Sequence, residues 1–281
     1  MDSTFLSLII FAIITIVYYL FKPKPMYMLV ESNEESVKDF GSKKMTYLVI
    51  YFLTVVISQF AINASVISAN CGGSLKDNIG SSAVITFVPW IFIFGSMIVI
   101  MLLFPGFKSA FSNVIGYFAV AGSANSVLSK LLVNSELESM IENESTSEEH
   151  KKGLKRAAES IVKLTGNKSI MINQIVPENF KEYWAILEPL MKREYFETKK
   201  LELVELKKQL FDLTVMRDSI GEAIWYFYTA VLLTFIVQYN IVVKGCVKNP
   251  DTLAASLKTY TDETQAAAQA QLNMDSQAYI T

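Results

Sequence analysis

Four long stretches of the chain contain no charged residue, and polar stretches separate them. One of these, residues 83–104, has 22 consecutive uncharged residues. A hydrocarbon core about 30 Å thick needs about 20 apolar residues at a rise of about 1.5 Å each. This stretch therefore predicts a transmembrane helix, and we expect it to end at Phe104 because Pro105 disfavours helix in the residue before it.

The other uncharged stretches are residues 5–21, 45–69 and 223–243. The first has Asp2 before it and Lys22 after it, whereas a signal peptide has basic residues before its apolar part and small residues at a cleavage site after it. We interpret it as an uncleaved span. Together the four stretches predict a helical protein that crosses a membrane about four times.

A regular apolar repeat precedes the last span. Proline is favoured in the first turn of a helix, and no residue breaks the pattern for about 50 residues after Pro189. We expect one long helix that begins at Pro189 and continues into the fourth span. Its expected packing face consists of Phe196, Leu203, Leu206, Leu210, Leu213 and Ile220. The apolar stripe is wider than a two-stranded seam, so packing within a small bundle is favoured over an oligomeric coiled coil.

The region between the third span and this helix is more varied. Residues 114–133 are small and apolar but interrupted by glycines, polar residues and Lys130, which favours a helix at the membrane interface or packed on protein. Residues 136–149 are acidic and serine-rich, as in an exposed connection. Residues 148–164 return to helical spacing.

These patterns predict an all-α, multi-span helical membrane protein with a helical extramembrane domain and a long helix running into the last span. The predicted parts are a first transmembrane helix at residues 1–22, a polar loop at 23–44, a transmembrane hairpin at 45–104, an extramembrane helical domain at 105–221, a fourth transmembrane helix at 222–243 and a polar Ala/Gln-rich tail at 244–281.

Lysines near the spans indicate the orientation. Cytoplasmic flanks of spans are enriched in lysine and arginine. The side that carries residues 105–221 has more such lysines than the other side: Lys22, Lys24, Lys43, Lys44 and Lys108 against Lys76, Lys244 and Lys248. The large domain is therefore expected in the cytoplasm.

Composition agrees with a membrane protein that has a large polar part, because 52% of the residues are hydrophobic, 19% are charged and the mean hydropathy is +0.33. The net charge of −2 argues against a nucleic-acid partner, since such proteins concentrate basic residues on one face. The chain has two cysteines and a single histidine, His150, which is too few for most metal-binding or catalytic sites built from these residues. We expect no enzyme activity, no cofactor and no metal.

Three amide side chains lie within the predicted spans. Gln59 and Asn63 are four residues apart on one helix face, and Gln238 lies in the last span. Amides in hydrocarbon usually face other protein. Hydrogen bonds between helices are favoured over a polar path or a ligand contact.

Cys71 and Cys246 each follow a span, the second and the fourth, on the same predicted side. A disulfide needs Cα atoms within about 7 Å, and the glycines beside both cysteines permit a close approach. The alternative is two unrelated cysteines. The sequence leaves both interpretations open.

The tract after the third span carries a resemblance to a known group of proteins. It follows Gln59, Asn63 and Trp90, and its residues are Pro105, Gly106, Phe107, Phe111, Ser112, Asn113, Gly116 and Tyr117. Residues 46–120 resemble membrane proteins of nucleocytoplasmic large DNA viruses, especially algal and giant viruses. Those proteins have a tract of the form FPGW-x-x-x-FSN-x-x-GY after a span, with tryptophan at the place of Phe107. The resemblance implies a virion protein of the internal bilayer that contacts the minor capsid lattice, and it carries over no catalytic residue.

Two classes of function follow. The first is a structural virion membrane protein that anchors the capsid shell to the internal lipid bilayer. Its expected partners are the bilayer and other capsid or membrane proteins of the virion, with a homo-oligomer as an open alternative. Its expected location is the virion internal membrane, and host endomembrane during assembly. The second class is a channel or transporter, which is disfavoured because none of the four uncharged stretches contains an acid or a base.

Overall fold

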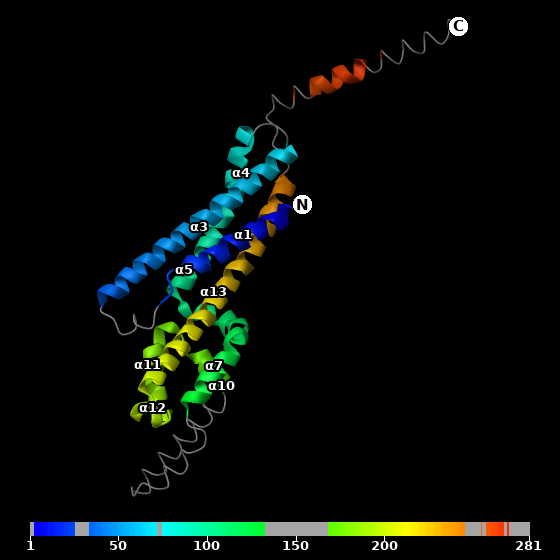
Figure 1. Ribbon diagram of the computed structural model, residues 1–281. Coiled ribbons are helices and arrows are strands. Elements are labelled where there is room, and N and C mark those ends of the chain that lie inside the picture. Colours follow the sequence, from blue (N-terminus) through cyan, green and yellow to red (C-terminus); the bar gives the residue numbers. More distant parts are fainter. Residues whose placement is uncertain are drawn as a thin grey trace.

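A computed structural model describes residues 3–25, 34–71, 75–132, 168–244, 254, 257–266 and 269. These residues are almost entirely helical, and their one extended contact is an isolated backbone bridge between Leu132 and Met191. The predicted all-α class is confirmed. Figure 1 shows an elongated molecule with long helices at one end and a group of short helices at the other.

Within the described part of the chain, four helical segments are long and apolar enough to cross a membrane. They are Ser3–Phe21, Glu35–Cys71, Asn78–Leu103 and Lys200–Val243. Each contains one of the four uncharged stretches of the sequence, apart from Phe104 at the end of the third, so the predicted multi-span architecture is confirmed at the level of helix length and composition.

Helix α1 (Ser3–Phe21) buries one face and exposes the other. Its buried residues recur every three or four positions, as one face of a helix requires: Ser7, Phe11, Thr15 and Tyr18. This face packs against α3 and α13. Ile13 and Ile16 on the opposite side are 55% and 59% exposed, which suits contact with lipid. The helix ends at Phe21, just before Lys22 and Pro23.

Helix α3 (Glu34–Cys71) is longer than the sequence pattern predicted. Residues 34–44, which were expected to belong to a polar loop, form its first turns. Acidic residues near a helix N-terminus interact favourably with the helix dipole, and Asp39 pairs with Lys43 one turn later at 2.7 Å. The predicted loop boundary at residue 44 is therefore wrong, because residues 34–44 belong to α3. The polar first turns extend beyond the bundle in Figure 1.

The third span consists of three consecutive helical segments. These are α4 (Leu75–Pro89), the π-helical turn η1 (Trp90–Phe94) and α5 (Gly95–Leu103). Proline lacks the N–H that would bond to the carbonyl four residues earlier, and the wider π turn begins directly after Pro89. The span ends before Pro105, as the sequence predicted.

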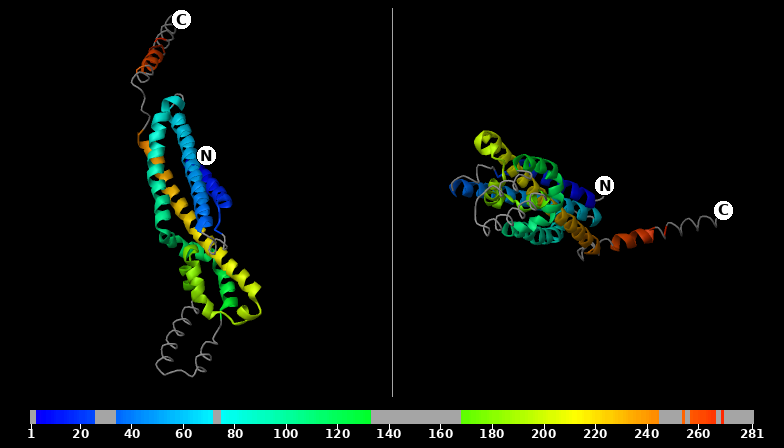
Figure 2. Two further views of the ribbon diagram at one scale, coloured as in Figure 1. Left: turned by 90° about the vertical axis from the view of Figure 1, so that its left-hand side faces the viewer. Right: turned by 90° about the horizontal axis from the view of Figure 1, so that it is seen from below.

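Helix α13 (Lys200–Lys244) connects the two ends of the molecule. Its 45 residues correspond to about 67 Å at about 1.5 Å per residue. Figures 1 and 2 show it passing from the group of short helices to the far end of the spans. The predicted continuity between the extramembrane helix and the last span is present.

The long helix begins later than the predicted Pro189. Pro189 lies in the 3-10 turn η5 (Glu188–Leu190), and Met191 is extended and pairs with Leu132, while Lys192 N–H bonds to the Leu131 carbonyl at 3.0 Å. A short helix, α12 (Glu194–Glu197), precedes α13. Pairing with a distant segment therefore overrides the local helical pattern.

The short helices pack around the first half of α13. They are α7 (Tyr117–Leu131), α10 (Lys168–Gln174), η4 (Pro177–Asn179), α11 (Phe180–Leu187), η5 and α12. Their core includes Leu128, Leu131, Phe180 and Trp184, together with Leu210 of α13. A second core lies among the spans. We refer to the group around the first of these cores as the helical domain.

Candidate functional site

Four ionisable side chains meet where the spans join the helical domain. Lys22 follows α1, Lys108 ends the 3-10 turn η2 (Pro105–Lys108), and Asp218 and Glu222 lie one turn apart on α13. Lys108 Nζ is 3.1 Å from Asp218 Oδ2 and 3.9 Å from Glu222 Oε2, and Lys22 Nζ is 3.7 Å from the same Glu222 oxygen. All four side chains are 14% exposed or less. We call these four residues the ion cluster.

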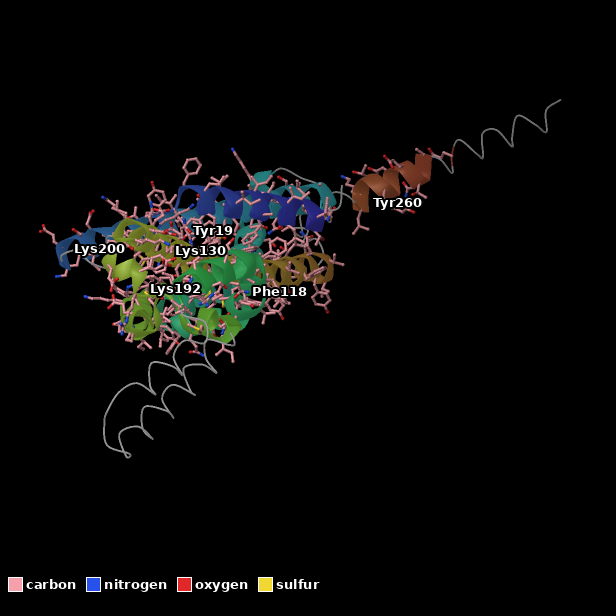
Figure 3. All side chains as sticks on the ribbon, turned by 60° about the horizontal axis from the view of Figure 1, so that its bottom comes forward. Tyr19, Phe118, Lys130, Lys192, Lys200 and Tyr260 are labelled. Atoms are coloured by element: carbon pink, nitrogen blue, oxygen red, sulfur yellow. The ribbon has the colours of Figure 1, made fainter. Side chains whose placement is uncertain are left out.

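Lys22 has the lower pKa of the two lysines in the ion cluster. Its Nζ lies 4.0 Å from the ring centroid of Tyr19, which is labelled in Figure 3, and 5.6 Å from that of Tyr18. Burial lowers the pKa of Lys22 to about 8, although the Glu222 carboxylate favours the charged form. Lys22 therefore loses its proton far more easily than an exposed lysine.

Lys108 behaves in the opposite way. Burial opposes its charge, but the carboxylates of Asp218 and Glu222 outweigh burial and raise the pKa of Lys108 above its usual value. The hydroxyl of Tyr226 donates to Glu222 Oε1 at 3.1 Å. Two ammonium groups thus face two carboxylates, and each charge has an opposite partner, as buried ions require.

Arg217, next to the ion cluster on α13, forms hydrogen bonds to the helical domain. Its side chain is 1% exposed. One guanidinium nitrogen donates to the carbonyl of Ile175 at 2.8 Å, and the other donates to the carbonyl of Ile172. These carbonyls lie at the C-terminal end of α10, where a helix lacks internal donors and where a positive charge is favourable.

The predicted amides meet at the opposite end of the bundle. Asn63 Nδ2 donates to Thr86 Oγ1 at 3.1 Å, Gln238 Nε2 donates to Asn63 Oδ1 at 3.4 Å, and Ser3 Oγ donates to Gln238 Oε1 at 3.2 Å. These bonds join all four spans.

Gln59 lies close to these amides and is fully buried. Its amide nitrogen donates to the Ser7 carbonyl at 3.1 Å, and the Ser7 hydroxyl donates to its amide oxygen. The three amide side chains within the spans therefore bond helix to helix, which was the favoured interpretation of their pattern.

An aromatic layer lies between the amides and the ion cluster. Phe11, Trp90 and Phe94 are each 0% exposed, and their ring centroids lie 5.6–6.1 Å apart. Phe94 also contacts the rings of Tyr51 and Tyr226. Packed rings therefore fill the centre of the bundle between its two polar layers.

The tract after the third span packs against α13. Phe107 stacks on Trp225 with centroids 4.6 Å apart, and Trp225 Nε1 donates to the Phe107 carbonyl at 3.2 Å. Phe111 meets the same indole edge-on at 4.7 Å. Asn113 accepts a bond from Asn173 at its carbonyl, and Tyr117 packs on the core of the helical domain. The tract is thus the junction between the third span, the helical domain and α13.

Two glycines allow this junction to form. A Cβ on Gly116, in the π-helical turn η3 (Ser112–Gly116), would lie 2.5 Å from the Arg217 carbonyl oxygen. A Cβ on Gly221 would lie 2.7 Å from the Ser112 backbone nitrogen. Both neighbours are backbone atoms, so only glycine permits this distance between η3 and α13.

Residues of the predicted packing face on α13 lie at different depths. Leu206 and Leu210 are buried in the core of the helical domain, and Leu203 and Leu213 pack against its edge. Ile220 is half-buried beside α1. Phe196 is 41% exposed and belongs to α12, so its assignment to this face was wrong, because the chain leaves the helical path at Thr198.

Cys71 ends α3 and is disulfide-bonded. The only other cysteine of the sequence, Cys246, lies outside the described residues, as do His150 and residues 136–164. The end of α3 and the end of α13 lie at the same end of the bundle (Figure 1). A bridge from Cys71 to Cys246 stays a prediction.

Among the described residues, no group of three or more histidine, cysteine, aspartate or glutamate side chains is placed to hold a metal ion. The charged site that the structure does contain was missed in the sequence. Its signal was two acids four residues apart directly before the last uncharged stretch, with one lysine directly after the first stretch and another just after the third.

Comparisons of the chain with protein families, with curated proteins and with solved structures found no match.

Proposed function

We propose that this protein is a structural, non-enzymatic virion membrane protein that anchors a capsid shell to the internal lipid bilayer. The observation that carries the proposal is the continuity of α13. The helix contributes Leu206 and Leu210 to the core of the helical domain and Leu233 and Val237 to the core of the spans. A load on the domain is therefore transmitted to the membrane through one helix and not through a flexible linker.

The ion cluster and the tract after the third span support the same role. Lys22 and Lys108 tie the ends of the first and third spans to the middle of α13, and Gly116 and Gly221 allow direct backbone contact there. Arg217 adds hydrogen bonds to α10. The junction is braced from several sides, as an anchor between a bilayer and a protein layer requires.

The viral setting rests on the resemblance of residues 46–120 to membrane proteins of nucleocytoplasmic large DNA viruses. On this proposal the helical domain contacts the minor capsid lattice, and the protein is inserted in host endomembrane before assembly. Its partners are the lipid bilayer and other capsid or membrane proteins, without nucleic acid.

A transport function is the second candidate, and one observation favours it. Ionisable residues buried near the membrane, such as Lys22 and Glu222, are typical of proton and ion pathways. The aromatic layer of Phe11, Trp90 and Phe94 weighs against it, because these packed rings separate the ion cluster from the amides. We therefore favour the anchor.

Cross-linking of purified virions tests the proposal. Lys130 and Lys200 are exposed on the helical domain and labelled in Figure 3, and Lys76 is exposed at the opposite end of the spans. Amine-reactive cross-linking followed by mass spectrometry should join Lys130 or Lys200 to capsid proteins, while Lys76 serves as the internal control. The protein should also remain with the membrane when the capsid is stripped.

Capsid cross-links from Lys76 but from neither domain lysine would contradict the anchor, as would loss of the protein with the stripped capsid. Proton or ion flux in vesicles containing the purified full chain, abolished by Glu222→Gln, would favour the transport candidate instead.

A further inference from the structure

An exposed apolar stripe continues beyond the third span. Leu103 and Phe104 at the end of the span are 67% and 63% exposed. On the following helical segments, Val114, Ile115 and Phe118 are 54%, 41% and 76% exposed. These residues recur at helical spacing, and the opposite face of the same segment packs on α13 through Ser112 and Gly116.

The exposed face of this segment changes character along α7. After Phe118 its exposed residues are small or polar: Ala119, Gly122, Ser123, Ser126 and Lys130. One continuous helix face therefore passes from large apolar to polar side chains near Gly122. Such a change along one face is typical of a helix that leaves a membrane.

Contacts with α13 show at which level along this long helix the change occurs. Gly116 lies against Arg217, and a groove farther along is lined by Gly122 and Lys130 of α7 with Gln209 and Asp212 of α13. The apolar residues of the stripe thus lie level with the ion cluster, and the polar residues lie level with Asp212.

Apolar side chains are also exposed at the same level on the other side of the molecule. Leu20 and Phe21 at the end of α1 are 69% and 70% exposed, and Met216 of α13 is 49% exposed. Leu20 and Met216 line a groove between these two helices, whose lining also includes Lys24 and Asp212. We call the exposed apolar side chains at this height the collar: Leu20, Phe21, Val114, Ile115, Phe118 and Met216.

We propose that the collar is embedded in the bilayer, so that the membrane surface meets the protein near Gly122 and Asp212 and the ion cluster lies below that surface. The collar is continuous with the exposed surface of the spans at Phe104, and it ends at a polar rim. A bilayer is the occupant that accounts for both properties. The inference requires only that the chain spans a membrane, and it does not depend on the viral setting.

This position differs from the one that the uncharged stretches indicate. The last such stretch begins at Ala223, and the helix from Ala223 back to Asp212 covers about 16 Å at about 1.5 Å per residue. Between Asp212, which is exposed at the polar rim, and Ala223, the charged side chains of Arg217, Asp218 and Glu222 are 14% exposed or less, so they do not prevent lipid from covering the outer face. With the collar in the bilayer, the membrane boundary on α13 lies near Asp212, several helical turns before Ala223.

Spin labels on the full chain in phospholipid vesicles test the collar. Single Ile115→Cys and Phe118→Cys variants place a label in the collar, and Ser126→Cys and Lys130→Cys place matched controls farther along α7. The parent chain without an added cysteine measures background labelling. Phe118 is exposed, so its replacement leaves both cores intact.

Relaxation by oxygen, which concentrates in lipid, is compared with relaxation by a water-soluble nickel chelate. Oxygen should dominate at residues 115 and 118, and nickel should dominate at 126 and 130. Equal nickel access at 118 and 126 would overturn the proposal. Protection of residue 118 from both reagents, with dipolar broadening that unlabelled chain dilutes away, would also overturn it by showing that a second copy covers the collar.

Discussion

Lys108 Nζ lies 3.1 Å from Asp218 Oδ2, and the two residues are 110 positions apart in the sequence. This ion pair joins the end of the third span to the middle of α13. Its side chains are 7% and 14% exposed, so it differs from the exposed pair of Lys43 with Asp39 one turn apart on α3.

Lys108→Ala should strongly destabilise the folded protein. It leaves the carboxylates of Asp218 and Glu222 with less compensating charge, and loss of one partner of a buried pair costs about 3–5 kcal/mol. Thermal unfolding of the full chain in detergent measures the effect. Lys43→Ala is the matched control and should leave the midpoint unchanged, because surface pairs contribute little. Equal midpoints for the two variants would contradict a stabilising ion cluster.

Lys22 and Lys108 should titrate far apart. NMR of lysines labelled with 13C at Cε, assigned with Lys22→Arg, should show a Lys22 midpoint near 8 and a Lys108 that keeps its proton above its ordinary pKa of 10.5. Between about pH 8 and 10.5, only the unfolded chain keeps the proton on Lys22, so the contribution of Lys22 to the free energy of unfolding rises with pH across that window. A Lys22 midpoint near 10.5 would show that its ammonium group is hydrated.

Gly221→Ala and Gly116→Ala should each separate η3 from α13. Overpacking typically costs about 1–3 kcal/mol, and here the new methyl group meets backbone atoms that cannot rotate away. Gly122→Ala is the control, since a Cβ there has no neighbour within 4 Å and alanine favours helix by about 0.5–1 kcal/mol. Thermal midpoints should fall for the first two variants and hold or rise for the third. The same response at all three glycines would refute the close crossing.

Leu210→Ala should destabilise the helical domain by about 2–5 kcal/mol, because it opens a cavity in a core where Leu210 is fully buried. Leu201→Ala on the same helix is the control, since Leu201 is 88% exposed. Limited proteolysis of the full chain in detergent should cut the domain of the Leu210 variant faster. Similar cleavage of both variants would mean that this face of α13 does not carry the domain.

Cys71 and Cys246 should be joined in the native protein. Mass spectrometry of unreduced protein should recover a linked peptide pair that disappears on reduction, and Cys71→Ser should abolish it. Two free thiols in protein isolated from intact virions would exclude the bridge.

Long uncharged stretches were enough to predict the all-α class and the four spans, because lipid imposes a length and an apolar composition that local sequence displays directly. The positions of Gln59, Asn63 and Gln238 within those spans likewise indicated that their amides need protein partners. The continuity of α13 into the last span could also be predicted from the sequence, since no residue between 200 and 244 is a strong enough helix breaker to end it.

Only the tertiary structure decided where that helix begins and which charged side chains of other segments pack against it. Pairing of Met191 with Leu132 ends the earlier helical pattern, and this contact has no local signal. Lys22, Lys108, Asp218 and Glu222 look in the sequence like ordinary charges flanking spans. They form one buried cluster because the close crossing at Gly116 and Gly221 brings distant segments together, and the stability of a buried ion depends on partners that only the folded chain supplies.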